Sequence, residues 1–221
     1  MITAHSGCDH TEDNSLAFIQ YALTLSVDAF EVDVRKNDEG ILVLSHDPAQ
    51  KDAPELSEAF RRLREHADKK INCDLKQKNL EGDVVDLARK YGVENQLIFT
   101  GDVNPELFRK GHAIYPFVQW YTNLEVLDPE FGSWHRTASE AEIMERLEQI
   151  LPKMQEYETC GLNWHYSLAE VVWKKARKLG IGISVWTVND PDEQKCWLAR
   201  NVENITSREI SRLIELRRTT E

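Results

Sequence analysis

The sequence predicts an α/β fold in which eight parallel strands, each followed by a helix, close into a (β/α)8 TIM barrel. Short β-branched runs alternate with amphipathic helical patterns along the chain. Eight of these runs are separated by enough residues for a helix, as a parallel barrel requires. The length of 221 residues suits one such barrel, so we expect a single domain over residues 1–221.

Nine runs have the composition of strands. They lie at 2–5, 29–34, 41–45, 71–75, 96–100, 113–119, 159–163, 181–188 and 204–206. The third run follows the second after only the turn Asp38-Glu39-Gly40, which is too short to join parallel strands. The run at 41–45 must therefore fold back as the antiparallel arm of a hairpin. Eight strands remain for the barrel.

The helices between the strands are indicated by apolar residues at spacings of three and four. Two examples are Leu16, Ile19 and Leu23, and Ala59, Leu63 and Ala67. We expect Asn14 and Ser57 to cap the first turns of these two helices. Pro152 interrupts the pattern over 140–158, which predicts two helices or one kinked helix. A final helix is expected from Ser207 onwards.

The charge balance bears on the class of partner. An excess of 38 acidic over 27 basic residues gives a net charge of -11, which repels nucleic-acid phosphates. The densest basic run, Arg61, Arg62 and Arg64, alternates with Glu58 and Glu65 and is typical of a solvated helix face. We therefore expect no nucleic-acid partner.

The apolar runs fall well short of the ~20 residues that a membrane helix needs. The chain opens with a strand-like segment instead of a signal peptide, so we expect no membrane span and a cytoplasmic location. The four cysteines are dispersed and form no CxxC pair. This spacing favours reduced thiols over a structural zinc site.

Two carboxylates interrupt the second strand run. Glu31 and Asp33 stand between Phe30, Val32 and Val34, and their side chains leave the same face of the strand, about 7 Å apart. Active sites of barrels gather at the carboxyl ends of the strands. Two carboxylates at such a point favour a hard divalent cation, Mg²⁺, Ca²⁺ or Mn²⁺. The alternative is the solvated face of an edge strand.

Other polar residues are expected at the same end of the barrel. Asp74 ends the fourth run, with Lys76 two residues further on the same face. Pairing about the hairpin turn places His46 near Asp33, and His5 ends the first run. A single histidine at a strand end is often structural, but two that flank a carboxylate cluster suit acid and base catalysis near neutral pH.

These residues belong to motifs that resemble a known family. In order and spacing, the opening of glycerophosphodiester phosphodiesterases resembles His5-Ser6-Gly7, Asp13-Asn14-Ser15, Glu31-Val32-Asp33-Val34, Asp38-Glu39-Gly40 and His46-Asp47. Later signatures of that family are similar to Asp74-Leu75-Lys76, Val185-Trp186-Thr187-Val188-Asn189 and Asn204-Ile205-Thr206. The similarity therefore runs from one end of the chain to the other.

The resemblance implies an activity, the hydrolysis of a glycerophosphodiester to glycerol 3-phosphate and an alcohol. In that family the glycerol 2-hydroxyl attacks phosphorus, and water then opens the cyclic phosphate. It implies that Glu31, Asp33 and Asp74 hold one divalent cation, Mg²⁺ or Ca²⁺, with Mn²⁺ as a further option. It also implies proton transfer by two histidines, of which we assign His5 as the acid and His46 as the base.

Two further residues are expected to contact the substrate, a small-molecule glycerophosphodiester. Lys76 would offset charge on the phosphoryl oxygens. Trp186 would line the pocket, unless it serves only in packing. Asn163 and His165, at the end of the seventh run, either face the mouth or are structural. Trp120 and Tyr121 are typical of core or rim packing.

Three departures from the family pattern bear on the substrate. Ser6 stands where the family has an arginine that contacts phosphate, which a serine cannot replace. Asp74 stands where the family more often has the longer glutamate. The stretch 48–55 is shorter than the segment that covers the glycerol site in many members. Two alternatives follow: a catalytically impaired protein that binds a phosphorylated ligand, and a phosphodiesterase acting on lysophospholipids or another diester.

Overall fold

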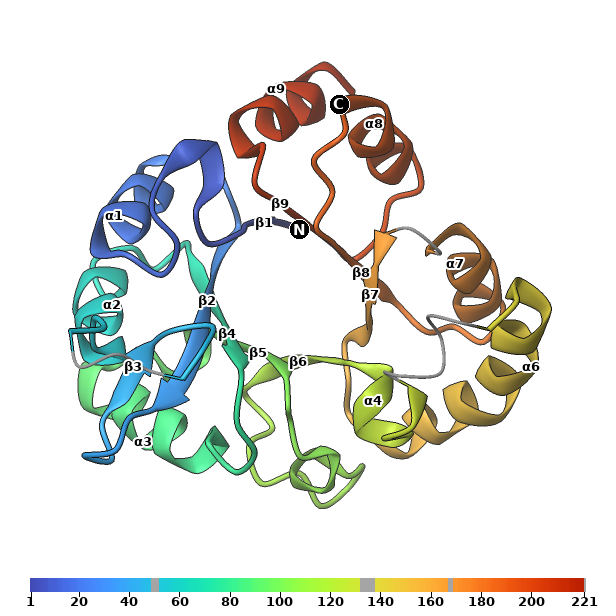
Figure 1. Cartoon of the computed structure of the whole chain (residues 1–221), viewed down its shortest axis with the longest axis horizontal. Coiled ribbons are helices and arrows are strands. Elements are labelled where there is room, and N and C mark those ends of the chain that lie inside the picture. Colours follow the sequence, from blue (N-terminus) through green and yellow to red (C-terminus); the bar gives the residue numbers. More distant parts are fainter. Residues whose placement is uncertain (49–51, 132–137, 167–168, 221) are drawn as a thin grey trace.

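The computed structural model describes residues 1–48, 52–131, 138–166 and 169–220. Viewed down the short axis, the strands form a ring and the helices surround it (Figure 1). Both N-terminal strand β1 and C-terminal strand β9 lie on the same side of that ring, next to each other. The described parts of the chain contain no helix that is long and apolar enough to span a membrane.

Eight parallel strands close the barrel, as the sequence predicts. They are β1 (Ile2–Ala4), β2 (Ala29–Lys36), β4 (Lys70–Leu75), β5 (Leu97–Gly101), β6 (Gln119–Thr122), β7 (Gly161–His165), β8 (Ile183–Trp186) and β9 (Asn204–Ser207). Each strand pairs with the next in this order, and β1 pairs with both β2 and β9. The ring is therefore closed, and the (β/α)8 TIM-barrel prediction is confirmed.

The helices follow the strands around the outside of the barrel. The α-helices are α1 (Leu16–Thr24), α2 (Leu56–Leu63), α3 (Glu81–Tyr91), α4 (Leu124–Leu127), α6 (Glu140–Ile150), α7 (Ala169–Lys178), α8 (Pro191–Ala199) and α9 (Ile210–Thr220). Short 3-10 helices lie at η1 (Cys8–His10), η2 (Glu94–Gln96), η3 (Pro105–Phe108) and η4 (Leu151–Glu156). The change from α6 to η4 at Pro152 confirms the predicted interruption.

The hairpin is also confirmed. Strand β3 (Leu42–Leu44) pairs antiparallel with β2, with Val34 opposite Leu44. The Asn37 side chain accepts hydrogen bonds from the backbone N–H groups of Glu39 and Ile41 at 3.0 and 2.9 Å, which fixes the turn. The register of the hairpin is therefore set by its own turn residues.

Some local predictions were wrong. The apolar run 113–119 is mostly a loop, and β6 begins only at Gln119. Pro116 within this run cannot donate a ladder hydrogen bond, and Val118 N–H donates to the Tyr115 carbonyl at 3.1 Å in a turn. Tyr115 and Phe117 pack against the core from this loop, so the hydrophobicity reflects burial and not a strand.

The helix starts also differ from expectation. Ser15, and not Asn14, caps α1, because its Oγ accepts the Phe18 N–H at 3.0 Å. Glu55 occupies the N-cap position of α2 instead of Ser57. The last helix begins at Ile210, three residues after the predicted start at Ser207. The first two shifts, of one and two residues, lie within the usual scatter of helix ends, and the third is one residue larger.

The strands present different chemistry to the two sides of the barrel wall. Phe30, Val32 and Val34 of β2 are fully buried in the apolar layer that also contains residues of the helices. The opposite faces of the strands carry polar groups in the barrel interior. There Asn204 accepts a hydrogen bond from Thr3 Oγ1 at 2.8 Å and donates to Ser184 Oγ at 3.0 Å. Glu31 and Asp33 lie on this inner face.

Candidate active site

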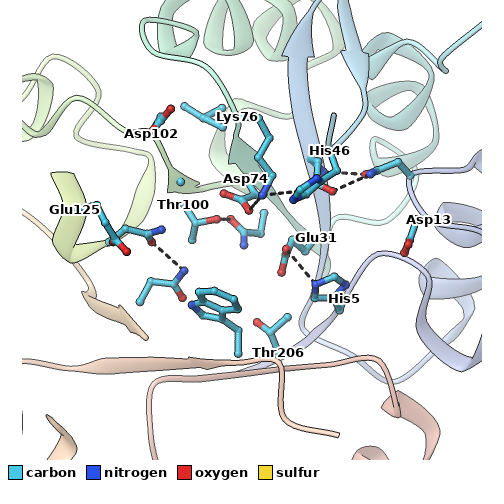
Figure 2. Close-up of a pocket in the computed structure, with 18 of the residues that line it drawn as sticks. His5, Asp13, Glu31, His46, Asp74, Lys76, Thr100, Asp102, Glu125 and Thr206 are labelled. Atoms are coloured by element: carbon cyan, nitrogen blue, oxygen red, sulfur yellow. Dashed lines mark hydrogen bonds and ion pairs between the residues drawn. The ribbon is translucent and has the colours of Figure 1, made fainter. Parts of the chain in front are cut away.

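A cavity of about 520 Å³ opens at the carboxyl ends of the strands (Figure 2). Its lining includes all the polar residues that the sequence analysis assigns to the metal, proton transfer or substrate contact. They are His5, Glu31, Asp33, His46, Asp74 and Lys76, with Trp186 and Asn163 also in the wall. Its size is typical of a small-molecule site. The five-residue cluster expected from the sequence therefore lies in one place.

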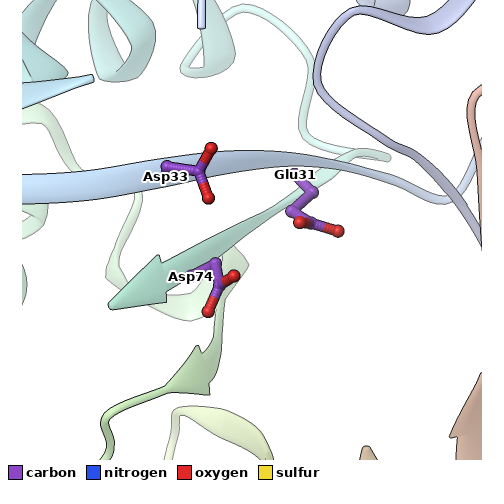
Figure 3. Close-up of side chains that lie close together, drawn as sticks. All are labelled: Glu31, Asp33 and Asp74. Atoms are coloured by element: carbon purple, nitrogen blue, oxygen red, sulfur yellow. The ribbon is translucent and has the colours of Figure 1, made fainter. Parts of the chain in front are cut away.

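Three carboxylates converge in the cavity from two adjacent strands (Figure 3). Glu31 and Asp33 extend from β2, and Asp74 from β4, where it is the register partner of Asp33. One oxygen from each of the three carboxylates lies within 4.8 Å of the others. Glu31 and Asp33 are buried, at 8% and 7% exposure, so water compensates little of their charge.

Lys76 joins two of these carboxylates. Its Nζ lies 2.9 Å from Asp33 Oδ1 and 2.6 Å from Asp74 Oδ2. Burial alone would lower the pKa of Lys76, but Asp74 and Asp33 outweigh it and raise the pKa above its usual value. Lys76 therefore stays charged, and its charge is taken up by the two aspartates.

Glu31 has no such lysine. Burial, together with the nearby charges of Asp74 and Asp33, raises the pKa of Glu31 to about 7 against the opposing effects of His5 and Lys76. Burial also raises the pKa of Asp74, although Lys76 opposes that rise. The cluster therefore holds more negative charge than the single lysine balances.

Asn14 fixes the orientation of Asp33. Its side-chain Nδ2 donates to Asp33 Oδ2 at 2.8 Å, and its Oδ1 accepts the Asp33 backbone N–H at 2.9 Å. With Lys76 on Oδ1, both carboxylate oxygens of Asp33 have partners. The sequence interpretation of Asn14 as a helix cap missed this role, because the contact spans 19 residues.

His5 is held so that one ring nitrogen faces the cluster. Its Nδ1 lies 2.7 Å from the Ser6 carbonyl, which can only accept, so Nδ1 is the donor. Its Nε2 lies 3.9 Å from Glu31 Oε1. Nε2 is therefore the atom through which His5 can exchange a proton with a bound molecule.

His46 reaches the cavity from the hairpin. Ser45 N–H donates to the Asp33 carbonyl at 3.0 Å, which fixes the chain just before His46. Arg35 Nε donates to the His46 carbonyl at 2.8 Å, and Nδ1 of His46 lies 3.1 Å from Asp47 Oδ1. In Figure 2, Glu31 lies between His5 and His46. His46 is much the more exposed of the two, with 68% of its side chain accessible against 18% for His5.

A glycine at the end of β5 makes room for Asp74. Gly101 has φ +82°, and a Cβ there would lie 2.3 Å from Asp74 Oδ1. Any side chain at this position would therefore push the carboxylate away, and the left-handed backbone adds strain for residues other than glycine. The sequence analysis did not single out this glycine.

The remaining predicted residues lie in three settings, namely the cavity wall, the surface and the core. Asn163 lines the cavity and donates to Asn123 Oδ1 at 3.0 Å. His165 packs edge-on against Trp186, with ring centroids 5.3 Å apart. Trp120 and Tyr121 are buried in packing, as predicted. Within the stretch 48–55, residues 49–51 lie outside the described part of the chain.

Ser6 does not face the cavity. It is 1% exposed, and its Oγ accepts the Asn14 backbone N–H at 2.5 Å. Its hydroxyl is used inside the loop and is not available to a bound molecule. Ser6 therefore does not supply the phosphate contact that an arginine at this position would make.

Comparisons with known proteins address the fold. No protein-family model matches the chain, and no curated protein matches it. Among solved structures, a glycerophosphodiester phosphodiesterase from Parabacteroides distasonis has a TM-score of 0.73 at 17% identity, over 99% of this chain and 97% of that one. One from Thermotoga maritima has a TM-score of 0.68 at 22% identity, over 98% and 97%. The chain has the glycerophosphodiester phosphodiesterase fold.

A third structure with this fold contains a ligand. It is a phosphodiesterase from Oleispira antarctica in complex with its product sn-glycerol-3-phosphate, with a TM-score of 0.66 at 16% identity. It covers 98% of this chain and 96% of its own. The resemblance inferred from short motifs is thus confirmed at the level of the fold, across essentially the whole chain.

The cluster in this glycerophosphodiester phosphodiesterase fold has the chemistry of a divalent-cation site. All three converging donors are carboxylate oxygens, the ligands that Mg²⁺ and Ca²⁺ prefer. The excess negative charge around Glu31 is what a divalent cation would compensate. The residues present therefore fit such an ion.

Residues that the sequence analysis missed also line the cavity. Arg208 follows β9 directly and pairs with Asp13 at 2.8 Å. Asp102 and Glu125 lie away from Asp13 and His5 in Figure 2. Arg208 could have been found from its place at a strand end, but the predicted helix start at Ser207 assigned it to a helix.

Proposed function

We propose that this protein hydrolyses glycerophosphodiesters, such as glycerophosphocholine, to glycerol 3-phosphate and an alcohol in a reaction that needs a divalent cation. The observation that carries the proposal is the convergence of three carboxylates, two of them buried, and two histidines in one cavity at the carboxyl end of the barrel. The likeness to solved phosphodiesterases of this fold supports it. We propose it for residues 1–221 as one domain.

Glu31, Asp33 and Asp74 would hold the cation, which would be Mg²⁺ or Ca²⁺, with Mn²⁺ as a further option. When bound, such a cation supplies Lewis-acid stabilisation of negative charge on the phosphoryl group. Asn14 and Lys76 keep Asp33 aligned through its two oxygens. Lys76 adds a fixed positive charge on the side of Asp74.

The two histidines would divide the proton transfers. His46 removes the proton of the glycerol 2-hydroxyl, whose oxygen forms a bond to phosphorus. The bond from phosphorus to the alcohol oxygen breaks, and His5 gives that oxygen a proton from Nε2. Water then opens the cyclic phosphate with the roles reversed. The assignment of His5 as acid is supported by the position of its Nε2, which faces the carboxylate cluster 3.9 Å from Glu31 Oε1.

The substrate is the least constrained part of the proposal. Trp186 provides an apolar wall, and Asn163 and Asn123 provide amide groups. The two alternatives, binding of a phosphorylated ligand without turnover and hydrolysis of lysophospholipids or another diester, use the same cavity. The cytoplasmic location stays a prediction, as does the expectation that nucleic acid is no partner.

The deciding experiment measures release of glycerol 3-phosphate from glycerophosphocholine by the purified full chain. We expect turnover with Mg²⁺, Ca²⁺ or Mn²⁺ and none in EDTA. His46→Ala should lower the turnover by about 10²–10⁴-fold, as for loss of a general base. His112→Ala is the matched control, because His112 is exposed in a loop and does not line the cavity.

Two results would contradict the proposal. Turnover that persists unchanged in EDTA would remove the role of the cation. Equal turnover by the His46→Ala protein and the parent would remove the histidine mechanism. Release of product from lysophosphatidylcholine but not from glycerophosphocholine would favour the lipid alternative, and binding of glycerol 3-phosphate without any turnover would favour the ligand-binding alternative.

A further inference from the structure

A phosphodiester is an anion, and the cavity offers it few cations. Among the described residues of the lining, Lys76 and Arg208 carry permanent positive charges. Lys76 already contacts both Asp33 and Asp74, so its charge is largely balanced within the cluster. Ser6 is buried and turned into its own loop. Arg208 is therefore the guanidinium that a bound phosphate can reach.

The backbone fixes Arg208 next to His5. Its N–H donates to Asn189 Oδ1 at 2.9 Å, and its carbonyl accepts the Asp9 N–H at 2.8 Å. The preceding Ser207 carbonyl accepts the His5 N–H at 2.9 Å. Arg208 thus extends from a segment that is hydrogen bonded on both sides, directly beside one of the two histidines.

The guanidinium is held by a single acidic side chain. Arg208 Nη1 lies 2.8 Å from Asp13 Oδ1, and the two side chains are 39% and 55% exposed. Among the described residues, Asp13 is the one side chain that pairs with this guanidinium, so most of its N–H donors remain available. An arginine that keeps a free edge can bind two oxygens of a phosphate at once.

Gly7 creates the space for this pair. Its φ is +74°, and a Cβ built there would lie 2.1 Å from Asp13 Oδ1 and 2.6 Å from Arg208 Nη1. The loop after His5 therefore has room for the ion pair only because this position has no side chain. Gly7, Asp13 and Arg208 therefore pack together at one corner of the cavity.

We infer that Arg208 binds the phosphoryl oxygens of the diester and that Asp13 positions its guanidinium. The inference rests on the proposed function, because it assigns the phosphate of the same substrate to a residue of the same cavity. Arg208 pairs with Asp13. Figure 2 shows Asp13 on the side of the cavity near His5, and Lys76 on another side beside Asp74. The phosphate would thus meet positive charge from two directions.

The test is the affinity for sn-glycerol 3-phosphate, measured by calorimetry with the full chain in Mg²⁺. Arg208→Ala should weaken binding about 10- to 100-fold, the effect of losing charge-assisted hydrogen bonds. Arg208→Lys keeps the charge but loses the planar fork, so about tenfold weaker binding is expected. In turnover assays the KM for glycerophosphocholine should rise by similar factors.

Asp13→Asn tests the positioning role. It keeps the shape of the side chain but removes its charge, and a fall in affinity of a few-fold is expected. If Asp13 acts only through Arg208, the double variant should bind no more weakly than Arg208→Ala alone. Additive losses would show that Asp13 has a separate role, and would overturn this part of the inference.

The matched control is Arg62→Ala. Arg62 also pairs with one carboxylate, Glu58, but on the outer face of α2 and away from the cavity. The affinity of the Arg62→Ala protein for sn-glycerol 3-phosphate should equal that of the parent. Equal affinity of Arg208→Ala and the parent would overturn the inference and leave the hydrolase proposal intact. Absence of turnover with arginine-dependent binding would overturn hydrolysis and leave the inference intact, and absence of both would overturn both.

Discussion

The two ends of the barrel use acidic side chains in opposite ways. At the amino end, Asp28 precedes β2 and accepts the Ile2 N–H at 2.6 Å and an Arg217 N–H at 2.8 Å. Glu203, before β9, accepts the Ile183 N–H at 2.5 Å. These acids each complete hydrogen bonds that tie a strand to its neighbours or to α9.

At the carboxyl end the acids gather instead. Glu31 and Asp33 belong to the same strand that Asp28 begins, yet they converge with Asp74 and share one lysine. Burial and mutual repulsion raise the pKa of Glu31 to about 7. Asp28, before β2, therefore stabilises the fold, whereas the acids further along β2 destabilise it. This is the division expected between the bottom and the top of such barrels.

The largest effect on turnover should come from a substitution at the carboxyl end of the barrel, where the acids gather. Glu31→Gln keeps the shape of the side chain but removes its charge, so a cation would lose one of three acidic ligands. We expect the release of glycerol 3-phosphate to fall at least about a thousandfold, since the Lewis-acid contribution is several kcal/mol. Retention of more than a tenth of the parent turnover would show that Glu31 is not a ligand.

The same variant should be more stable than the parent when EDTA is present. The carboxyl of Glu31 keeps its proton to about pH 7 in the folded protein but loses it near pH 4.5 when unfolded. Its contribution to stability is therefore present at low pH and lost as the pH rises through about 7. At pH 8 the unfolding free energy of Glu31→Gln should exceed that of the parent by roughly 3 kcal/mol, with no difference below pH 4. Parallel stability curves of the two proteins would contradict this.

A smaller effect of opposite kind is expected at the amino end. Asp28→Ala leaves the buried N–H of Ile2 without its acceptor and removes the partner of Arg217. The free energy of unfolding should fall by about 1–2 kcal/mol, while KM and kcat stay at the parent values. A loss of turnover in a folded Asp28→Ala protein would mean that the two ends are coupled.

The smallest effect should be found outside the barrel. Arg61 and Arg62 on α2 both pair with Glu58 in solvent, as the predicted solvated face implies. Arg62→Ala should change the unfolding free energy by no more than about 0.5 kcal/mol. Thermal unfolding of this variant sets the baseline against which the other changes are compared.

The sequence predicted the parts of the site that depend on strand periodicity. Alternation placed Glu31 and Asp33 on one face, and the short turn at 38–40 required the hairpin that brings His46 back to them. The barrel rule then placed Asp74 at the same mouth. The cluster in the structure has the predicted members.

Contacts between distant segments were not predictable in the same way. The local sequence explained Asn14 as a helix cap, and only the fold shows that Asn14 makes two hydrogen bonds with Asp33. The bridge of Lys76 to Asp33 depends on the register of β2 against β4, which no local pattern fixes. The run 113–119 around Pro116 was wrongly predicted as a strand for a related reason, because hydrophobicity indicates burial and not backbone conformation.

The closure of the ring by β1 and β9 has a consequence for synthesis of the protein. His5 and the segment that carries Arg208 stand side by side in space, but His5 is synthesised long before Arg208. A nascent chain still lacking β9 has neither the neighbour of His5 nor the arginine at that corner. The chain would therefore become able to bind phosphate only after β9 and Arg208 have left the ribosome and β9 has paired with β1.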